Sequence, residues 1–199
     1  VSFAEFKDEA ERLAGYLQHE CGVEAGDRVL LYMQNSPQWV LAFYAILRAN
    51  AVVVPVNPMN RAEELKHYII DPDARVALTT GDLAGELACA SDALEPQLRL
   101  KHLIVTQFND AFDAAHAGDD APPAAWNDWL TTPHAMPALA GGVVHAWAEA
   151  RAAIGDAPEL LTGPYDLAIL PYTSGTTGLP KGCMHTHASI MHNAVSSSV

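Results

Sequence analysis

A short segment near the end of the chain, residues 173–182, gathers the side chains most able to do chemistry. Its hydroxyls and glycines are Thr173, Ser174, Gly175, Thr176, Thr177 and Gly178. Glycines let main-chain N–H groups converge on one point, hydroxyls donate hydrogen bonds, and Lys181 adds a positive charge. Pro180 limits the freedom of the segment. The combination predicts an anion-binding loop, and phosphate is the anion that suits it best.

Two other interpretations of this segment are weaker. The nucleotide-binding motif G-x-x-x-x-G-K-[ST] needs a Gly-Lys pair followed by Ser or Thr, but Lys181 lies between Pro180 and Gly182. Clusters of Ser, Thr and Gly also form ordinary solvated turns. The length of this cluster, the apolar run at 165–172 before it and the lysine within it favour phosphate binding over a plain turn.

The elements that could position such a loop alternate through the first half of the chain. Helices are predicted where apolar residues recur at helical spacing, over residues 3–20, 38–50, 61–70 and 81–98. Strands are predicted at short continuous apolar runs, over residues 28–33, 51–56, 75–80 and 102–105, with Pro55 at an edge or at a strand's end. Alternating strands and helices indicate βαβ units and a parallel sheet covered on both faces, so the predicted fold class is α/β.

The alternation stops after the fourth strand. Residues 107–164 are dominated by Ala, Asp, Gly and Pro, and we interpret them as a variable surface connection with one short helix at 144–153. A strand at 165–172 then leads into the phosphate-binding loop and the start of another helix. The chain therefore divides into a βαβ portion at 1–106, the connection at 107–164 and the loop portion at 165–199.

Composition excludes several classes of partner. The 24 acidic residues outnumber the 11 Lys and Arg, and the net charge of −13 argues against a nucleic-acid partner and an anionic membrane surface. No apolar stretch is long enough for a bilayer span. The three cysteines lack the spacing of a disulfide framework or a zinc site, which predicts reduced thiols in a cytoplasmic protein and no metal site. Both ends of the chain look cut, because it begins with Val1 and stops shortly after its most informative segment.

The segment 172–182 also resembles, almost letter for letter, the signature loop of the adenylate-forming superfamily. That superfamily comprises acyl-CoA synthetases, aryl-CoA ligases, peptide-synthetase adenylation domains and luciferases. Residues 22–29, 35–36 and 54–58 look like the N-terminal region of these enzymes, and Thr186-His187 matches the Thr-His pair of acyl-CoA synthetases. The resemblance spans nearly the whole chain and is weakest at 107–164. It is specific for the superfamily but not for the acid.

The resemblance implies the N-terminal part of the adenylate-forming fold and a two-step reaction. A carboxylate attacks the α-phosphate of ATP to give acyl-adenylate and pyrophosphate, and the thiol of CoA then displaces AMP. Residues 173–178 would hold the β- and γ-phosphates, and Lys181 would stabilise the departing pyrophosphate as the catalytic residue. His187 would line the acyl pocket, whereas His185 is assigned to local packing. The Mg²⁺-linked glutamate and the C-terminal catalytic lysine of the family would lie beyond Val199.

The expected function is that of an AMP-forming acid–CoA ligase, with fatty acids favoured over aromatic acids. ATP, CoA, Mg²⁺ and a carboxylic acid are the implied small molecules. An aryl-acid–CoA ligase or another adenylating enzyme is the alternative within enzymes. The third possibility is a phosphate- or nucleotide-binding fragment without turnover, and we expect the 199-residue chain alone to be inactive.

Overall fold

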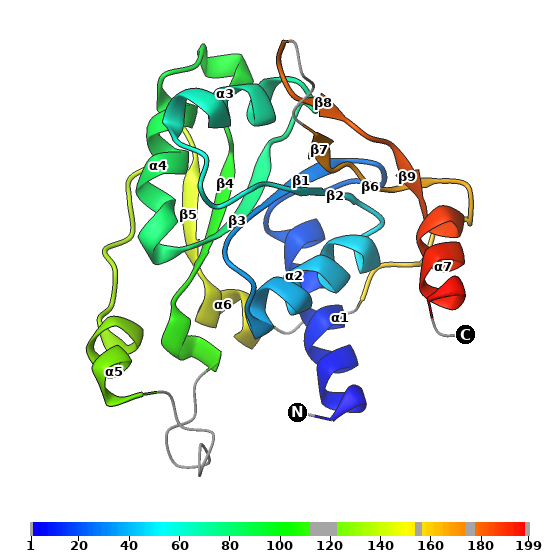
Figure 1. Cartoon of the computed structure of the whole chain (residues 1–199), viewed down its shortest axis with the longest axis horizontal. Helices are drawn as coiled ribbons and strands as arrows, with labels where there is room; N and C mark the ends of the chain where they lie inside the picture. Colours follow the sequence, from blue (N-terminus) through cyan, green and yellow to red (C-terminus); the bar gives the residue numbers. More distant parts are fainter. Residues whose placement is uncertain (1, 112–122, 154–156, 174–177, 198–199) are drawn as a thin grey trace.

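The computed structural model describes residues 2–111, 123–153, 157–173 and 178–197. Its core is a seven-stranded sheet in the order β5-β4-β3-β1-β2-β6-β9 (Figure 1). The strands are β1 Arg28–Tyr32, β2 Val52–Pro55, β3 Val76–Thr80, β4 His102–Thr106, β5 Val143–Ala146, β6 Leu167–Ile169 and β9 His185–Thr186. All neighbours from β5 to β6 are parallel, and β9 is antiparallel to β6. The predicted α/β class with a largely parallel sheet is confirmed.

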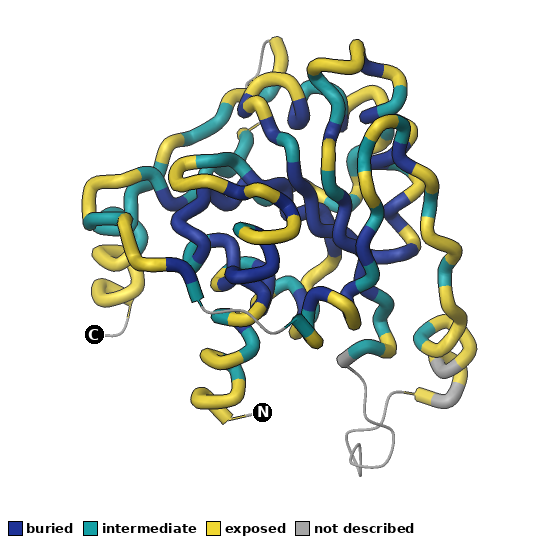
Figure 2. Tube along the Cα trace, turned by 180° about the vertical axis from the view of Figure 1, so that it is seen from behind, coloured by how far each residue is buried: buried dark blue, intermediate teal, exposed yellow. Residues whose placement is uncertain are grey.

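Helices cover both faces of the sheet. The helices α1 Phe3–His19, α2 Pro37–Arg48 and α6 Trp147–Ala152 pack on one face, and α3 Ala62–Ile70 and α4 Gly81–Asp92 pack on the other. Two further helices, α5 Ala124–Thr131 and α7 His187–Ser196, and a small hairpin of β7 Tyr172–Thr173 and β8 Lys181–Gly182 lie outside these layers. Buried residues concentrate along the central strands (Figure 2).

The continuous apolar runs form strands because both of their faces are buried. In β1, Val29 and Leu31 join the cluster under α1 and α2, whereas Leu30 and Tyr32 join the cluster under α3 and α4. Side chains of a strand alternate between faces, so a strand between two helical layers needs apolar residues at every position. The sequence pattern therefore identified the central strands correctly, and Pro55 is indeed the last residue of its strand.

The structure corrects three expectations about secondary structure. The fourth helix ends at Asp92 instead of near 98, and a separate 3-10 turn, Pro96–Leu98, follows because proline cannot donate to a continuing helix. The predicted strand at 165–172 is divided at Pro171 into β6 and β7. The span 107–164 also contains α5, β5 and α6, and β5 extends the main sheet.

Within this span the predicted helix at 144–153 is only partly correct. Its first residues belong to β5, which pairs with β4, and the helix α6 starts at Trp147. Trp147 is 2% exposed and packs in the core under α1, so this part is not a surface connection. The boundaries at 107 and 164 remain a prediction.

Asn50 joins the end of α2 to the chain segment that leads towards β6. Its backbone is left-handed, with φ of 60°, and its side chain is buried. The side-chain oxygen accepts hydrogen bonds from the main-chain N–H groups of Leu161 (2.8 Å) and Thr162 (3.3 Å), and Nδ2 donates to the carbonyl of Glu159 (2.8 Å). Asparagine adopts this backbone conformation more readily than most other residues.

Replacing Asn50 with alanine is therefore expected to lower the free energy of unfolding by about 2–3 kcal/mol. The change removes three hydrogen bonds. It also places alanine, which disfavours the left-handed conformation, at a position with positive φ. Urea unfolding of the 199-residue chain would measure the effect. Asn193→Ala, at an exposed position of α7, is the matched control and should change stability little. Equal stability of the two variants would show that Asn50 does not anchor the segment.

Candidate functional site

The small hairpin brings two of the predicted site residues together. Thr173 in β7 is paired directly with Lys181 in β8, and Tyr172 is paired with Gly182. Both Thr173 and Lys181 are exposed at the base of the loop that joins the strands. Four predicted phosphate ligands, Ser174, Gly175, Thr176 and Thr177, lie outside the described residues. Gly178 follows them with φ of +107°, a conformation that favours glycine.

The hairpin lies beyond the carboxyl end of the parallel sheet. β7 follows β6, whose neighbour β2 runs parallel to it, so the chain leaves the sheet at the edge where βα units of open sheets bind ligands. Gly182 packs closely over this exit, because a Cβ there would lie 2.9 Å from Cγ of Leu170. The position of the hairpin therefore agrees with a binding role for its loop.

Helix α3 and its C-cap residue Asp71 hold the hairpin in place. Nε2 of His67 lies 2.7 Å from the carbonyl oxygen of Pro180, and the hydroxyl of Tyr172 donates to Oδ2 of Asp71 at 2.6 Å. The ring of Tyr172 packs against Tyr68 with a centroid distance of 4.8 Å. Burial, followed by the hydrogen bond to Asp71, raises the pKa of Tyr172, so its hydroxyl stays protonated and remains a donor. These anchors were not identified from the sequence, where His67 and Asp71 appear only as the end of a helix.

A cavity between α3 and the hairpin does not fit a phosphate chain. It is lined by Asn57, Asn60, Glu63, Glu64, His67, Tyr68, Tyr172, Leu179 and Pro180. Two carboxylates in its wall, those of Glu63 and Glu64, repel an anion. The loop between β2 and α3 forms the other side of the cavity.

Tyr32, at the end of β1, fixes this second loop. Its hydroxyl donates to the carbonyl of Asn60 at 2.7 Å. Burial, with a smaller contribution from Glu86, raises the pKa of Tyr32 to about 12. In the unfolded chain the phenol ionises near pH 10, about where model tyrosines do. The stability that Tyr32 contributes is therefore complete below about pH 10 and is lost as the pH rises towards 12.

Tyr32→Phe is expected to make the free energy of unfolding depend less steeply on pH in the alkaline range. At neutral pH the variant should lose about 1 kcal/mol with the hydrogen bond to Asn60. Between about pH 10 and pH 12 the free energy of unfolding of the variant should fall less steeply than that of the wild type, because the buried phenol that resists ionisation is absent. Urea unfolding across this range measures both effects. The exposed Tyr165, changed to Phe, is the control, and equal slopes for both variants would contradict the argument.

His187 is the first residue of α7 and directly follows β9. Thr186 caps this helix by accepting a hydrogen bond from the main-chain N–H of Ser189 at 3.2 Å. The imidazole of His187 lines a shallow groove with Tyr44, Leu47, Arg48, Leu160, Thr162, Gly163 and Pro164. Its Nε2 is buried, and no described residue offers it a hydrogen bond. The neighbouring His185 belongs to β9 and pairs with Ile169.

Comparison with known proteins identifies the family of this chain. The family model described as AMP-binding enzyme matches residues 1–199. The chain belongs to this family. This match confirms the resemblance drawn from the loop 172–182. The acid–CoA ligases in the AMP-binding enzyme family use ATP and CoA.

Several relatives of this chain in the AMP-binding enzyme family are acid–CoA ligases. A long-chain-fatty-acid–CoA ligase of Escherichia coli is 31% identical over 200 residues, which cover 97% of this chain and 33% of the relative. A 4-coumarate–CoA ligase of Narcissus pseudonarcissus is 31% identical over 191 residues, covering 95% and 29%. The structure of a long-chain-fatty-acid–CoA ligase from Archaeoglobus fulgidus aligns with a TM-score of 0.73 at 24% identity, covering 100% and 32%. The chain spans about a third of the length of these relatives.

No helix in the described ranges combines the length and the apolar character that a membrane crossing requires.

Proposed function

We propose that this chain is part of an AMP-forming acid–CoA ligase that activates a carboxylic acid, with fatty acids favoured. In the first step a carboxylate oxygen attacks the α-phosphorus of ATP, and the bond from that phosphorus to pyrophosphate breaks. In the second step the sulfur of CoA attacks the acyl carbon, and AMP leaves. The mixed anhydride formed first is a far better electrophile than the carboxylate.

The residues of the hairpin would act by positioning and by electrostatic stabilisation. The loop 173–178 would donate hydrogen bonds to the β- and γ-phosphates, and the ammonium of Lys181 would balance the charge that accumulates on the departing pyrophosphate. The observation that carries this proposal is the pairing of Thr173 with Lys181, which sets a hydroxyl and a cation at the base of one loop. Among the described residues, none forms an ion pair with Lys181.

The acid is proposed from the relatives and from the groove at His187. Both a fatty-acid and a 4-coumarate ligase are about equally identical to this chain, which leaves aromatic acids as the alternative. The groove has mainly apolar side chains and one buried, unpaired imidazole nitrogen. An acyl chain suits the apolar wall of this groove.

The proposed reaction also implies a metal ion and a location in the cell. Mg²⁺ would accompany ATP, and the ligand expected for it lies outside this chain. Unpaired thiols at all three cysteines and the use of ATP and CoA favour a cytoplasmic protein without nucleic-acid partners. The alternative is a phosphate-binding polypeptide without turnover, which the 199 residues would be if they acted alone.

ATP–pyrophosphate exchange by the full-length ligase tests the proposal. We expect exchange that depends on the added acid when a panel of fatty and aromatic acids is supplied, and the preferred acid identifies the substrate class. The 199-residue chain alone is the matched comparison and should support no exchange. If no acid of either kind supports exchange by the longer protein, the ligase assignment is wrong.

A further inference from the structure

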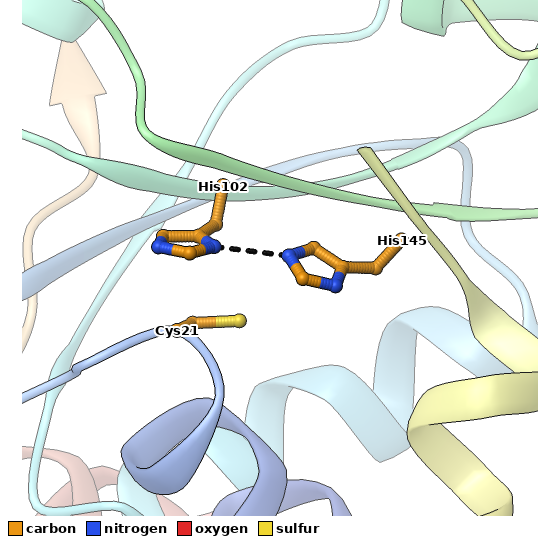
Figure 3. A group of neighbouring side chains, drawn as sticks. All are labelled: Cys21, His102 and His145. Atoms are coloured by element: carbon orange, nitrogen blue, oxygen red, sulfur yellow. Dashed lines mark hydrogen bonds between the residues drawn. The ribbon is translucent and has the colours of Figure 1, made fainter. Parts of the chain in front are cut away.

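Three side chains from distant parts of the sequence converge under one face of the sheet, away from the hairpin. Cys21, His102 and His145 each direct one potential ligand atom into the same space, and these atoms all lie within 4.8 Å of one another (Figure 3). Nδ1 of His102 lies 2.9 Å from Nε2 of His145, and the sulfur of Cys21 points towards the gap between the two rings. Cys21 and His145 are buried, and His102 is partly buried.

The fold itself brings these residues together. His102 starts β4 and His145 lies in the adjacent strand β5, where its register partner is Ile104. His102 and Ile104 are two residues apart and so share a face of the sheet, which places both imidazoles on the face covered by α1 and α6. Cys21 lies just past the end of α1, where Gly22 turns the chain with φ of +65°. The thiol therefore meets the imidazoles from the opposite layer.

We propose that Cys21, His102 and His145 form a binding site for a borderline-soft divalent cation of the Zn²⁺ class. One thiolate and two imidazoles are ligands that zinc prefers, and three protein ligands leave the fourth tetrahedral position to water. In such a site two nitrogens lie about 3.3 Å apart, given Zn–N bonds of about 2.0 Å. The two nitrogens therefore need to separate by a few tenths of an ångström from their present 2.9 Å, and the rings need to turn so that both lone pairs point at the cation.

Tyr16 provides the second shell of this site. Its hydroxyl lies 2.7 Å from Nδ1 of His145, the ring nitrogen that faces away from the cluster. With a cation bound to Nε2, the proton of His145 resides on Nδ1 and is donated to the oxygen of Tyr16, which fixes the tautomer and the ring orientation. Cys21 loses its proton to solvent when the sulfur binds the cation, and both imidazoles remain neutral, so one proton is released for each cation bound.

The electrostatic surroundings also suit a cation. Glu20 and Glu149 interact electrostatically with His145, and their negative charges favour a cation at this cluster. The alternative is that the two imidazoles only form a hydrogen bond with each other and bind no cation. Metal titration distinguishes the two cases.

In the order of strands in the sheet, the site at β4 and β5 lies far from β6, the strand that leads into the hairpin of β7 and β8. It connects the end of α1 with the edge strand β5 and its neighbour β4, whereas the hairpin of β7 and β8 is anchored on α3 at the other face of the sheet. A cation here would stabilise the packing of α1 on the sheet edge without touching ATP. The inference therefore does not depend on the proposed ligase activity.

Co²⁺ titration of the 199-residue chain, prepared without a histidine tag and stripped with chelator, tests the site directly. We expect one equivalent of Co²⁺ to produce a thiolate-to-metal charge-transfer band, which Zn²⁺ then abolishes by displacement. Zn²⁺ should also raise the Tm of the chain, because a cation that binds only the folded state stabilises it. Cys21→Ala should remove the band, and Cys89→Ala, at an exposed position of α4, should leave it intact.

Two further variants keep the test decisive if Cys21→Ala folds poorly. His102→Gln changes the least buried ligand and should weaken Zn²⁺ binding by more than roughly 100-fold, beyond the usual effect of second-shell changes. Tyr16→Phe should weaken it by roughly 10- to 100-fold. Absence of a charge-transfer band in the wild type, a band that survives Cys21→Ala, or Zn²⁺ affinity unchanged in His102→Gln would each overturn the proposal.

Discussion

Lys181→Ala in the full-length ligase is expected to lower the rate of ATP–pyrophosphate exchange by about 10²–10³-fold. The ammonium lies at the base of the loop, opposite Thr173 across the hairpin, and no described side chain neutralises it. Charge on pyrophosphate grows as its bond to the α-phosphorus breaks, so in the proposed role the lysine would stabilise the transition state more than it stabilises bound ATP. The fall should therefore appear mainly in kcat and less in the KM for ATP.

Lys7→Ala is the matched control for this experiment. Lys7 lies on α1, is largely exposed and forms a salt bridge only with Glu11 of the same helix among the described residues. Loss of such a pair changes little. If the two alanine variants exchange pyrophosphate equally fast, Lys181 has no role in adenylation and the assignment of the hairpin fails.

Leu78→Ala is expected to lower the free energy of unfolding by about 2–5 kcal/mol. Leu78 lies in the middle of β3, between β1 and β4, and its side chain is 0% exposed in the cluster under α1 and α2. Truncation leaves a cavity that the sheet cannot close, because strands on both sides hold the backbone. Urea denaturation of the 199-residue chain measures the loss.

Leu160→Ala makes the same chemical change at a position that is 64% exposed. It should alter stability by no more than about 0.5 kcal/mol. A small effect at both positions would mean that the sheet is not packed as described, and a large effect at both would mean that Leu160 is covered in solution.

The central strands and their helices could be predicted because their signals are local. Val29 and Leu31 alternate with Leu30 and Tyr32 between two buried layers, and this produces an unbroken apolar run. The strand β5 escaped prediction because it is an edge strand of mixed character, and Val143 is 51% exposed. Its pairing with β4 depends on residues far away in sequence, which no local pattern reveals.

The candidate site could be predicted only in part, for the same reason. The hydroxyl and glycine loop is one continuous segment, so its residues could be named from sequence, whereas its anchors His67 and Asp71 lie on a helix far upstream. The cluster of Cys21, His102 and His145 is the extreme case. Each ligand comes from a different element, and the spacing rules that excluded zinc apply only to ligands close together in the chain.

The pairing of β2 with β6 has a consequence for how the chain folds during synthesis. Val53 and Ile169 are register partners, although most of the chain lies between them. While the ribosome makes the intervening residues, the edge of β2 has no partner and presents free N–H and C=O groups to other chains. We therefore expect nascent chains that stop before β6 to aggregate or to require a chaperone, and chains that include β6 to become protected.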